Sequence, residues 1–259
     1  MSRKLEMDGK RWLKNSISIW SDIKKSKIER NLSHPAIFPV MLVERLLECF
    51  SIEDDFVLDP FVGSGSTLIG AWRSNRYSLG LDLKEEYKKE YEGRKAKEDN
   101  EDKYEPDYVV DNAVNVDDYV DKDVDLTISS FPYWDIMNRD RTADNKGIRN
   151  YGNKDGDVSN IKDYNKFLGK LKNVFNEVYN LTSIGGYCCL VVMDIRKKDK
   201  FYPLHMDVSE FMRDIGFELD DIIIWDRRDE YNNLKPLGYP YVFRVNKVHE
   251  FIMIFQKRG

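Results

Sequence analysis

Short apolar runs separated by polar stretches recur along the chain and predict seven β-strands. The first five runs are almost continuously apolar, which is typical of strands buried on both faces of a sheet. Only a long polar loop joins the last two runs, so we expect those strands to pair antiparallel. The predicted strands are Phe56–Leu58, Ser78–Leu83, Tyr108–Val110, Leu126–Ser129, Tyr187–Met193, Asp221–Trp225 and Phe251–Phe255.

Helical patterns lie between these strands. Residues 34–50 and 163–183 place apolar side chains on one face at helical spacing. Residues 66–75 follow the first strand directly, and Asp207–Gly216 ends on a glycine, which often terminates a helix. Strands that alternate with helices predict an α/β fold with a mostly parallel seven-stranded sheet and helices on both faces. We expect one domain covering all 259 residues, with an N-terminal helical extension over about residues 1–50.

Two polar stretches interrupt this alternation. Residues 92–106 have the composition of a linker. Residues 138–162 are rich in Asn, Asp, Gly, Arg and Lys, and are much longer than the usual connection of ~4–6 residues. A loop of that length is either a binding loop or lid, or simply disordered.

Composition excludes several classes of protein. Apolar residues make up 41% of the chain, which is enough for a sizeable core. No apolar run approaches the ~20 residues that span a bilayer, and the charged N-terminus lacks the apolar segment of a secretory signal. The three cysteines, Cys49, Cys188 and Cys189, cannot all pair with one another. A disulfide scaffold is therefore excluded, and a cytoplasmic protein with reduced thiols is expected.

The net charge of −5 argues against coating of nucleic acid by charge alone. Its distribution changes that picture. Residues 84–125 hold 16 acidic and 8 basic side chains, whereas residues 1–30 hold 9 basic and 4 acidic ones. The acidity is thus local and leaves room for a basic face elsewhere, although a solvated surface explains each cluster equally well.

The segment VLDPFVGSGSTLIGA, residues 57–71, points to a ligand site. An apolar strand ends at Asp59, a turn with Gly63 and Gly65 follows, and a helix begins near Thr67. Glycines allow a ligand to approach the backbone closely, and the helix N-terminus offers free amides and a positive dipole end. In open α/β sheets, ligands bind beside such turns at the carboxyl ends of strands.

Two acidic residues suggest which ligand binds there. The segment has neither the spacing of a P-loop nor GxGxxG. Asp82 ends the second strand, where a carboxylate can accept hydrogen bonds from ribose hydroxyls. Asp111 follows the third strand and could reach an adenine amino group. A tight turn with solvated acids is the alternative interpretation.

The fourth strand ends in a second candidate site, TISSFPYWDI at residues 127–136. Pro132 restricts Phe131 to extended geometry and so fixes the direction of its carbonyl. The Ser130 hydroxyl and the Phe131 carbonyl could bind the hydrogens of an exocyclic amine, while Tyr133 stacks on the base. Such a site would act by orientation and electrostatics rather than with a strong base. Alternatively, the aromatic side chains are ordinary core residues at a strand end.

Together these residues resemble the S-adenosylmethionine-dependent DNA amino-methyltransferases, which modify N4 of cytosine or N6 of adenine. The family's cofactor motif DPFxGSGT is similar to residues 59–67, and its catalytic motif (S/D)PPY is similar to residues 130–133. HPAIFP, residues 34–39, is similar to the segment that leads into a helix flanking the methionine moiety. The resemblance implies a Rossmann-like class I methyltransferase fold and S-adenosylmethionine as cofactor. It implies the following cofactor-binding residues: His34, Pro35, Asp59, Phe61, Gly63, Gly65, Thr67, Asp82 and Asp111.

One departure from the family pattern falls on the catalytic motif. Phe131 stands where the family has its first proline, with a bulkier side chain and a less rigid turn. The family uses the backbone carbonyl at that position, so Phe131 can still serve, with reduced activity or an altered target as a consequence. Ser130 favours N4 of cytosine, because members that act on adenine more often carry Asp there.

A base inside a duplex cannot reach such a pocket, so it must be flipped out, and the protein must contact DNA. The loops 138–162 and 226–246 and the segment 196–200 are the basic candidates for contacts with phosphates. The predicted partners are double-stranded DNA and a cognate restriction endonuclease, with no membrane. The candidate DNA-contacting residues are Arg139, Arg141, Lys146, Arg149, Lys197, Arg227, Arg228, Lys235 and Arg244.

Other residues offer no further chemistry. His34, His205 and His249 lack metal-ligand spacing, so no metal site is expected. No Pro-Cys dipeptide provides a nucleophile for covalent attack on cytosine. Two other functions stay open at this point: methylation of RNA or a small amine, and a non-catalytic nucleic-acid-binding scaffold.

Overall fold

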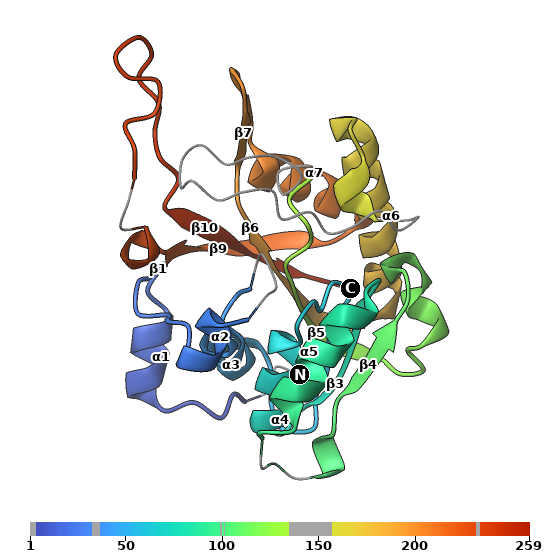
Figure 1. The fold of residues 1–259 in the computed structure, drawn as a ribbon. Helices are drawn as coiled ribbons and strands as arrows, with labels where there is room; N and C mark the ends of the chain where they lie inside the picture. Colours follow the sequence, from blue (N-terminus) through green and yellow to red (C-terminus); the bar gives the residue numbers. More distant parts are fainter. Residues whose placement is uncertain (1–3, 33–36, 99, 101, 135–156, 232–233) are drawn as a thin grey trace.

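A mixed eight-stranded sheet runs through the centre of the protein (Figure 1). The computed structural model describes residues 4–32, 37–98, 100, 102–134, 157–231 and 234–259. The strands of the sheet are β1 (Ile19–Trp20), β2 (Phe56–Asp59), β3 (Tyr77–Asp82), β4 (Asp107–Val110), β5 (Val124–Ser129), β6 (Thr182–Val192), β9 (Glu218–Asp226) and β10 (His249–Gln256). Their spatial order is β1-β9-β10-β6-β5-β2-β3-β4.

The sheet has one antiparallel strand, β10, which lies between β6 and β9 and pairs antiparallel with both. All other pairings are parallel. The predicted mostly parallel α/β sheet and its antiparallel last pair are confirmed. The predicted count of seven strands is wrong by one, because β1 adds a short edge strand beside β9. Two residues carry too little periodicity to show in the sequence.

Helices cover both faces of the sheet, as predicted. Buried residues of α3 pack with β2, β5, β6 and β10 on one face, and those of α6 and α7 pack on the other (Figure 1). Neighbouring Cys188 and Cys189 belong to these two opposite cores, and both thiols are free and buried. The helices are α1 (Gly9–Asn15), α2 (Lys27–Arg30), α3 (Val40–Phe50), α4 (Ser66–Arg73), α5 (Glu85–Lys95), α6 (Tyr164–Leu181) and α7 (Leu204–Ile215), with short 3₁₀ turns η1 (Asp102–Tyr104), η2 (Ala113–Asp118), η4 (Val158–Asn160) and η5 (Arg228–Glu230).

The helix α5 corrects the prediction of a linker that begins at residue 92. This helix is strongly charged and buries only Tyr91 and Arg94, so it shows almost no apolar stripe. Both buried side chains contact the glycine-rich turn, and that contact provides the packing that the periodicity did not show. The linker prediction is therefore wrong for residues 92–95, which belong to α5. Contacts with the glycine-rich turn, rather than a broad apolar face, hold this helix in place.

Two segments project from the carboxyl edge of the sheet in the same direction (Figure 1). One is a hairpin of β7 (Ile195–Lys197) and β8 (Lys200–Tyr202), which follows β6. The other is the connection from β9 to β10. In the described part of the chain, no helix is both long enough and apolar enough to cross a bilayer.

Candidate active site

An open hollow lies at the carboxyl ends of β2, β3 and β5. Parallel strands present their carboxyl ends at one edge of the sheet, where ligands of such folds bind. The hollow brings together the two motifs that the sequence places almost 70 residues apart. The predicted site residues that line it are Phe61, Gly63, Asp82, Asp111, Ser130, Phe131, Pro132 and Tyr133.

Asp59 lies beneath the hollow rather than in its wall. Its carboxylate is fully buried and accepts hydrogen bonds from the Phe61 amide at 3.0 Å, the Ser129 hydroxyl at 2.6 Å and the Thr67 hydroxyl at 2.6 Å. Burial raises the pKa of Asp59 to about 7. The hydrogen bonds of Asp59 with Thr67 and Ser129 join β2, α4 and β5, and binding of a cofactor by Asp59 and Thr67 stays a prediction.

The glycine turn is shaped by two residues with left-handed backbone. Gly63 has φ 49° and lines the hollow, whereas Gly65 has φ 80° and lies against Tyr91. A Cβ at Gly65 would lie 2.2 Å from the Tyr91 ring, so only glycine fits there. The Tyr108 hydroxyl donates to the Gly63 carbonyl at 2.7 Å. Aromatic side chains therefore hold the turn from behind.

A buried ion pair connects this turn to the N-terminal segment. Arg94 Nη1 donates to the Ser64 carbonyl at 2.7 Å, and Arg94 Nη2 lies 3.7 Å from Glu29. Glu29 in turn accepts from the amide of Val40, the first residue of α3, at 2.7 Å. An isolated buried charge is costly, so this pairing keeps turn, α2 and α3 in one arrangement.

Two predicted acids face the hollow. Asp82 accepts from the amides of Gly63 at 3.1 Å and Lys84 at 3.0 Å, and burial raises its pKa to about 6. Asp111 accepts from Asn115 at 3.0 Å, and this and further hydrogen bonds lower its pKa. Each oxygen of a carboxylate has two lone pairs, so both acids can still accept from a ligand.

A third acid in the hollow was assigned by the sequence to a DNA-contacting loop. Asp157, near the end of the 138–162 stretch, is buried and lines the hollow together with Val158. Its Oδ1 accepts from the amide and hydroxyl of Ser159, at 2.8 and 2.6 Å. Its Oδ2 is buried and has no hydrogen-bond partner among the described residues. An unpaired carboxylate oxygen in a cavity wall suits a cationic or hydrogen-bond-donating ligand.

The catalytic turn is held by aromatic packing. The buried Phe131 ring has edge contacts with Phe61, Phe175 and Tyr133, at centroid distances of 6.0–6.4 Å. These contacts fix the position at which the family pattern has a proline, so the expected loss of rigidity is offset. Trp134 closes the turn with φ 51° and donates from its indole to the Ile161 carbonyl at 2.7 Å. Such strain in a non-glycine residue is typical of functional turns.

A chain of hydrogen bonds runs through this turn from Ser130 to β10. The Tyr133 hydroxyl lies 3.2 Å from Ser130 Oγ and donates to Glu250 Oε2 at 2.9 Å, with the Val191 carbonyl at 3.2 Å. Glu250 forms an ion pair with Arg227 and is buried. Burial raises the pKa of Tyr133 well above its usual value, so the phenol keeps its proton.

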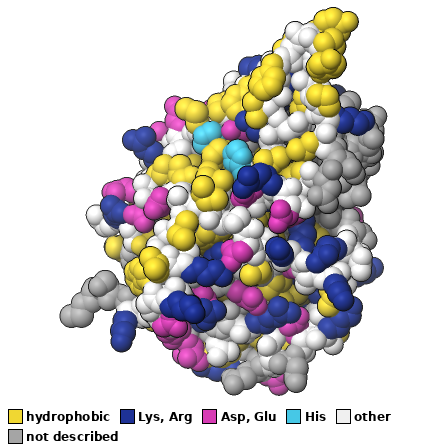
Figure 2. Space-filling model, turned by 90° about the vertical axis from the view of Figure 1, so that its left-hand side faces the viewer, with side chains coloured by type: hydrophobic (Ala, Val, Ile, Leu, Met, Phe, Trp, Pro, Cys, Tyr) yellow, Lys and Arg dark blue, Asp and Glu magenta, His cyan; other side chains and the backbone are white. Residues whose placement is uncertain are grey.

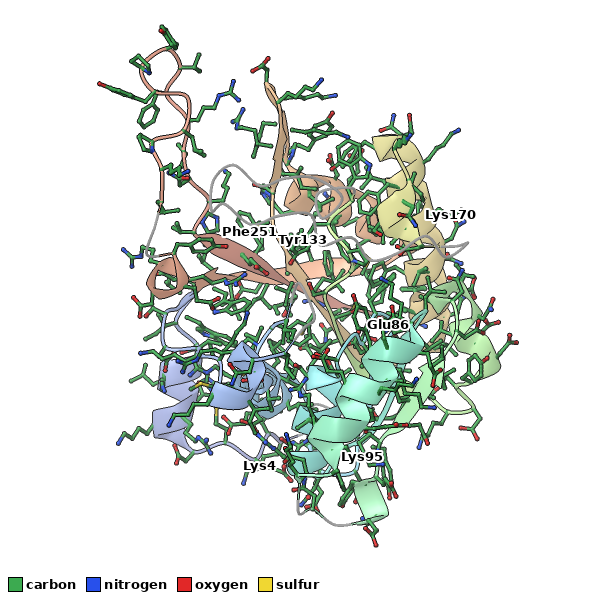
Figure 3. The ribbon with its side chains drawn as sticks, in the orientation of Figure 1. Lys4, Glu86, Lys95, Tyr133, Lys170 and Phe251 are labelled. Carbon is green, nitrogen blue, oxygen red and sulfur yellow. The ribbon has the colours of Figure 1, made fainter. Side chains whose placement is uncertain are left out.

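The number of protons fixes the direction of this chain. The Glu250 carboxylate and the Val191 carbonyl can only accept, so the single phenolic proton of Tyr133 points toward them. The contact between Tyr133 and Ser130 must then use the proton of Ser130. With this proton arrangement, Ser130 Oγ, which lines the hollow, has lone pairs that can accept from a group bound there. Figure 3 shows Tyr133 beside Phe251 of β10, and both side chains pack against the same core.

The predicted DNA-contacting residues differ in whether the structure describes them and in how exposed they are. Arg139, Arg141, Lys146 and Arg149, like the cofactor-binding candidates His34 and Pro35, lie outside the described residues. The other candidates lie within the described residues and are taken in turn below.

Arg227 is not available to DNA phosphates. Its guanidinium is largely buried, paired with Glu250 and with Glu230 at 2.7 Å, and lies 4.6 Å above the Trp225 ring. Lys197 Nζ lies 3.5 Å above the Trp134 ring, and its contact with DNA stays a prediction. The sequence shows charge but not which charges have partners, so both residues look alike there.

Arg228 and Arg244 remain at the surface. Arg228 is exposed and forms an ion pair with Asp226 at 2.6 Å, whereas Arg244 pairs with Asp199 at 2.6 Å. Lys235 accepts, through its carbonyl, a hydrogen bond from Asn246 at 3.0 Å. Within the described part of the chain, no three His, Cys, Asp or Glu side chains are grouped so as to hold a metal ion.

Sequence reasoning missed Glu250, Arg94 and Asp157. A charged residue directly before the apolar run of β10 is a signal that could have revealed Glu250, because buried charges require partners. Arg94 and Asp157 lie in highly charged stretches, where one buried side chain has no distinguishing pattern.

The fold is that of Rossmann-like methyltransferases. A putative rRNA methylase from Clostridium thermocellum aligns with a TM-score of 0.52 at 14% identity, covering 83% of this chain and 95% of that one. An rRNA methylase from Streptococcus thermophilus aligns with a TM-score of 0.51 at 12% identity, covering 86% and 98%. At these identities the similarity shows the fold alone.

The sequence profile of a family described as DNA methylase, of the N6/N4 methyltransferase type, matches residues 2–93 and 124–259. The chain belongs to this family, whose cofactor is S-adenosylmethionine. Type II methyltransferase M.ScaI from Streptomyces caespitosus is 39% identical over 80 residues, covering 29% of this chain and 26% of that protein. Type II methyltransferase M.MthZI from Methanothermobacter thermautotrophicus is 28% identical over 155 residues, covering 57% and 43%. The matches thus span less than half the length of these relatives.

Proposed function

We propose that this chain transfers a methyl group from S-adenosylmethionine to the exocyclic amine of a base in DNA, with N4 of cytosine favoured over N6 of adenine. The observation that carries the proposal is that Ser130 lines the same hollow as the glycine turn and the acids, with its hydroxyl oxygen 3.2 Å from that of Tyr133. An acceptor beside a cofactor site is what an amine with two hydrogens requires. The preference for cytosine rests on the serine at position 130, because family members that act on adenine more often carry Asp there.

The hollow suits the proposed cofactor. When bound, S-adenosylmethionine supplies a methyl group on a positively charged sulfur. We expect Asp82 to accept from the ribose hydroxyls and Asp111 from the adenine amino group. The unpaired Oδ2 of Asp157 suits the ammonium group of the methionine moiety. Three carboxylates in one wall match a cofactor that carries two positive charges and one negative charge.

Asp157 provides a direct test of this arrangement. Asp157→Asn should weaken binding of S-adenosylhomocysteine by about tenfold, as loss of a charged hydrogen bond does. Asp121→Asn changes the same charge at an exposed position and should leave the affinity unchanged. Isothermal titration calorimetry of both variants decides the matter. Equal affinities for the two variants would remove Asp157 from the cofactor site.

At the other end of the hollow, the amine would be held by two acceptors. Ser130 Oγ and the Phe131 carbonyl take its two hydrogens and direct the nitrogen lone pair at the methyl group. Tyr133 forms a wall of the hollow against which the base would stack. The site would act by orienting the amine and by stabilising the charge that develops on its nitrogen. The nitrogen–methyl bond would form as the sulfur–methyl bond breaks, which leaves S-adenosylhomocysteine, and the methylated nitrogen would then lose one proton to water. Because that nitrogen carries the positive charge by then, its proton is acidic and no strong base is required.

The proposed partner is double-stranded DNA with the target base flipped out, because a stacked base cannot enter the hollow. A cognate restriction endonuclease and residence in the cytoplasm complete the proposal. The curated relatives named above are type II methyltransferases, which supports the assignment to modification systems.

The test is methyl transfer from labelled S-adenosylmethionine to mixed-sequence duplex DNA, followed by mass spectrometry of the nucleosides. N4-methylcytosine is the expected product. N6-methyladenine would keep the reaction and overturn the assignment of Ser130 to cytosine. Absence of methyl on DNA, with cofactor binding intact, would overturn the proposal in favour of an RNA substrate or a non-catalytic scaffold.

A further inference from the structure

The connection from β9 to β10 carries a group of exposed apolar side chains. We call residues 234–248 the projecting arm. Its tip holds aromatic residues of which Tyr239 is 79%, Tyr241 91% and Phe243 93% exposed. Figure 2 shows hydrophobic side chains along the prong that rises above the body of the protein. Exposed apolar patches of this kind usually mark an interaction site.

The projecting arm has a defined internal structure. The amides of Tyr241 and Val242 donate to the Gly238 carbonyl at 2.9 and 2.8 Å, which closes the tip. Gly238 has φ 77°, and a Cβ there would lie 2.0 Å from the Val242 carbonyl, so the turn requires glycine. Asn246 donates to the Lys235 carbonyl at 3.0 Å and joins the two limbs. The aromatic side chains are therefore held outward by an ordered backbone.

The arm is braced against the β7–β8 hairpin. Arg244 donates to the Lys198 carbonyl at 2.7 Å and pairs with Asp199 at 2.6 Å. Lys247 Nζ lies 4.6 Å above the ring of Phe201. The two projections thus form one unit at the carboxyl edge of the sheet.

Both parts of this unit are rooted at the catalytic turn. The base of the arm is closed by the Arg227 amide, which donates to the Val248 carbonyl at 2.9 Å, and Arg227 pairs with the Glu250 that holds Tyr133. The hairpin reaches Trp134 through Lys197. A molecule that binds this unit would therefore lie close to the catalytic turn and the hollow.

The charge of the unit identifies its partner. Residues 195–202 and 234–248 hold seven basic side chains and one acidic one, in a chain whose net charge is −5. Cations around an exposed aromatic tip match nucleic acid, whose phosphates need positive charge and whose bases offer flat apolar faces. A second copy of this chain would bring seven more cations against the first seven, which disfavours self-association through this unit.

We infer that the tip of the projecting arm inserts Tyr241 and Phe243 between bases of duplex DNA beside the target, while the basic side chains of the arm and the hairpin hold the phosphates. The inference rests on the proposed function for the choice of duplex DNA. Apolar side chains that enter a base step unstack it and kink the duplex, which lowers the cost of flipping a neighbouring base. Exposed aromatic residues are thus needed at the place where a base must leave the stack.

The experiment uses the full chain and measures two properties that need no methyl transfer. Fluorescence anisotropy gives the affinity for a short mixed-sequence duplex, and relaxation of a closed circular plasmid by topoisomerase I reports unwinding through the linking number. The double variant Tyr241→Ser, Phe243→Ser should lose the linking-number change and bind the duplex about tenfold more weakly. The control pair Ile184→Ser, Leu13→Ser removes exposed apolar side chains elsewhere and should behave as the wild type.

Three other outcomes are informative: two of them overturn the inference, and one rejects only the proposed function. Wild-type unwinding and affinity in the tip variant would overturn it. A change in sedimentation coefficient on tip substitution, with DNA affinity unchanged, would identify the tip as a contact between copies. Unwinding by the wild type with no methylated nucleoside would retain the arm and reject the proposed function, so the two failures are distinguishable.

Discussion

Two neighbouring serines divide the site into halves that are built differently. Ser129 Oγ donates to the buried Asp59 and belongs to the cofactor half, the part formed by β2, α4 and the glycine turn. Ser130 Oγ bonds Tyr133 and belongs to the target half, the part formed by the catalytic turn, β10 and the projecting arm. Ser129 is the last residue of β5 and Ser130 the first residue after it, so the end of one strand serves both halves.

The halves differ in how far apart their parts lie in the chain. Asp59, Phe61 and Thr67 of the cofactor half fall within nine residues of one another, and contacts from Ser129, Tyr108 and Arg94 brace this local motif from a distance. The chain of contacts in the target half joins residues 130 and 133 to residue 250. The comparison teaches that local sequence defines the cofactor half, whereas tertiary structure assembles the target half.

Removing one serine at a time should separate the halves most sharply. Ser130→Ala should lower turnover by about 100-fold or more, since it removes an acceptor used in the transition state. Binding of S-adenosylhomocysteine should change less than about twofold. Ser129→Ala should instead lower the free energy of unfolding, by about 1–3 kcal/mol, because it leaves buried Asp59 short of a donor. Single-turnover kinetics, calorimetry and urea unfolding measure these effects, and equal loss of turnover and affinity in Ser130→Ala would refute the division.

Glu250 should show the next largest effect. Glu250→Ala removes the acceptor that orients Tyr133, and a misplaced Ser130 should lower turnover by about 10- to 100-fold with cofactor affinity intact. Glu250→Gln retains a carbonyl acceptor and should recover part of the rate. The matched control is Glu230→Gln, which loses a contact with the same Arg227 but does not contact Tyr133. A Glu230→Gln variant as slow as Glu250→Ala would mean that Arg227, not the hydrogen-bond chain, matters.

A glycine exchange tests the cofactor half. Gly65→Ala places a Cβ against Tyr91 at positive φ, so it should lower the free energy of unfolding by about 1–3 kcal/mol and weaken binding of S-adenosylhomocysteine. Gly93→Ala lies in α5 with open space around it and should stabilise the protein by up to about 1 kcal/mol. Urea unfolding of both variants gives the comparison. Neither substitution should alter the hydrogen bonds of the target half, so any loss of turnover should follow from weaker cofactor binding alone.

The smallest expected effect is a pH dependence of cofactor binding. Burial raises the pKa of Asp82 to about 6, and the ionised carboxylate is the form that accepts from ribose hydroxyls. Affinity for S-adenosylhomocysteine should be flat above pH 7 and fall by at most about tenfold per unit below pH 6. Asp82→Asn should remove this dependence. Asp111→Asn should keep it, because hydrogen bonds lower the pKa of Asp111 and leave it ionised over that range.

The sequence predicts the cofactor half of the site better than the target half. Apolar runs predict the long strands and glycine spacing predicts the turn, because both depend on neighbouring residues. Asp82 and Asp111 follow from the rule that ligands bind at strand ends. The sequence does not predict the edge strand β1 or the helix α5. A strand of two residues and a helix with two buried side chains leave little hydrophobic pattern.

Residues whose role depends on a distant partner are the ones that the sequence misplaces. Arg227 looks like a ligand for phosphate until Glu250 is known to face it. Asp157 looks like part of a surface loop until its carboxylate is found beside the glycine turn. Asp59 shows the reverse case: its place at a strand end in the cofactor motif suggests a ligand contact. Its carboxylate instead accepts hydrogen bonds from Ser129 and Thr67 below the hollow.

The place of Glu250 on β10 has a consequence for the order in which the protein is made. A ribosome delivers β2, the glycine turn and Ser130 long before it delivers residue 250, which is separated from Tyr133 by 117 positions. A nascent chain that already folds its cofactor half still leaves Tyr133 without its acceptor. The hydrogen-bond chain from Ser130 is thus completed only after β10 has emerged and has inserted between β6 and β9.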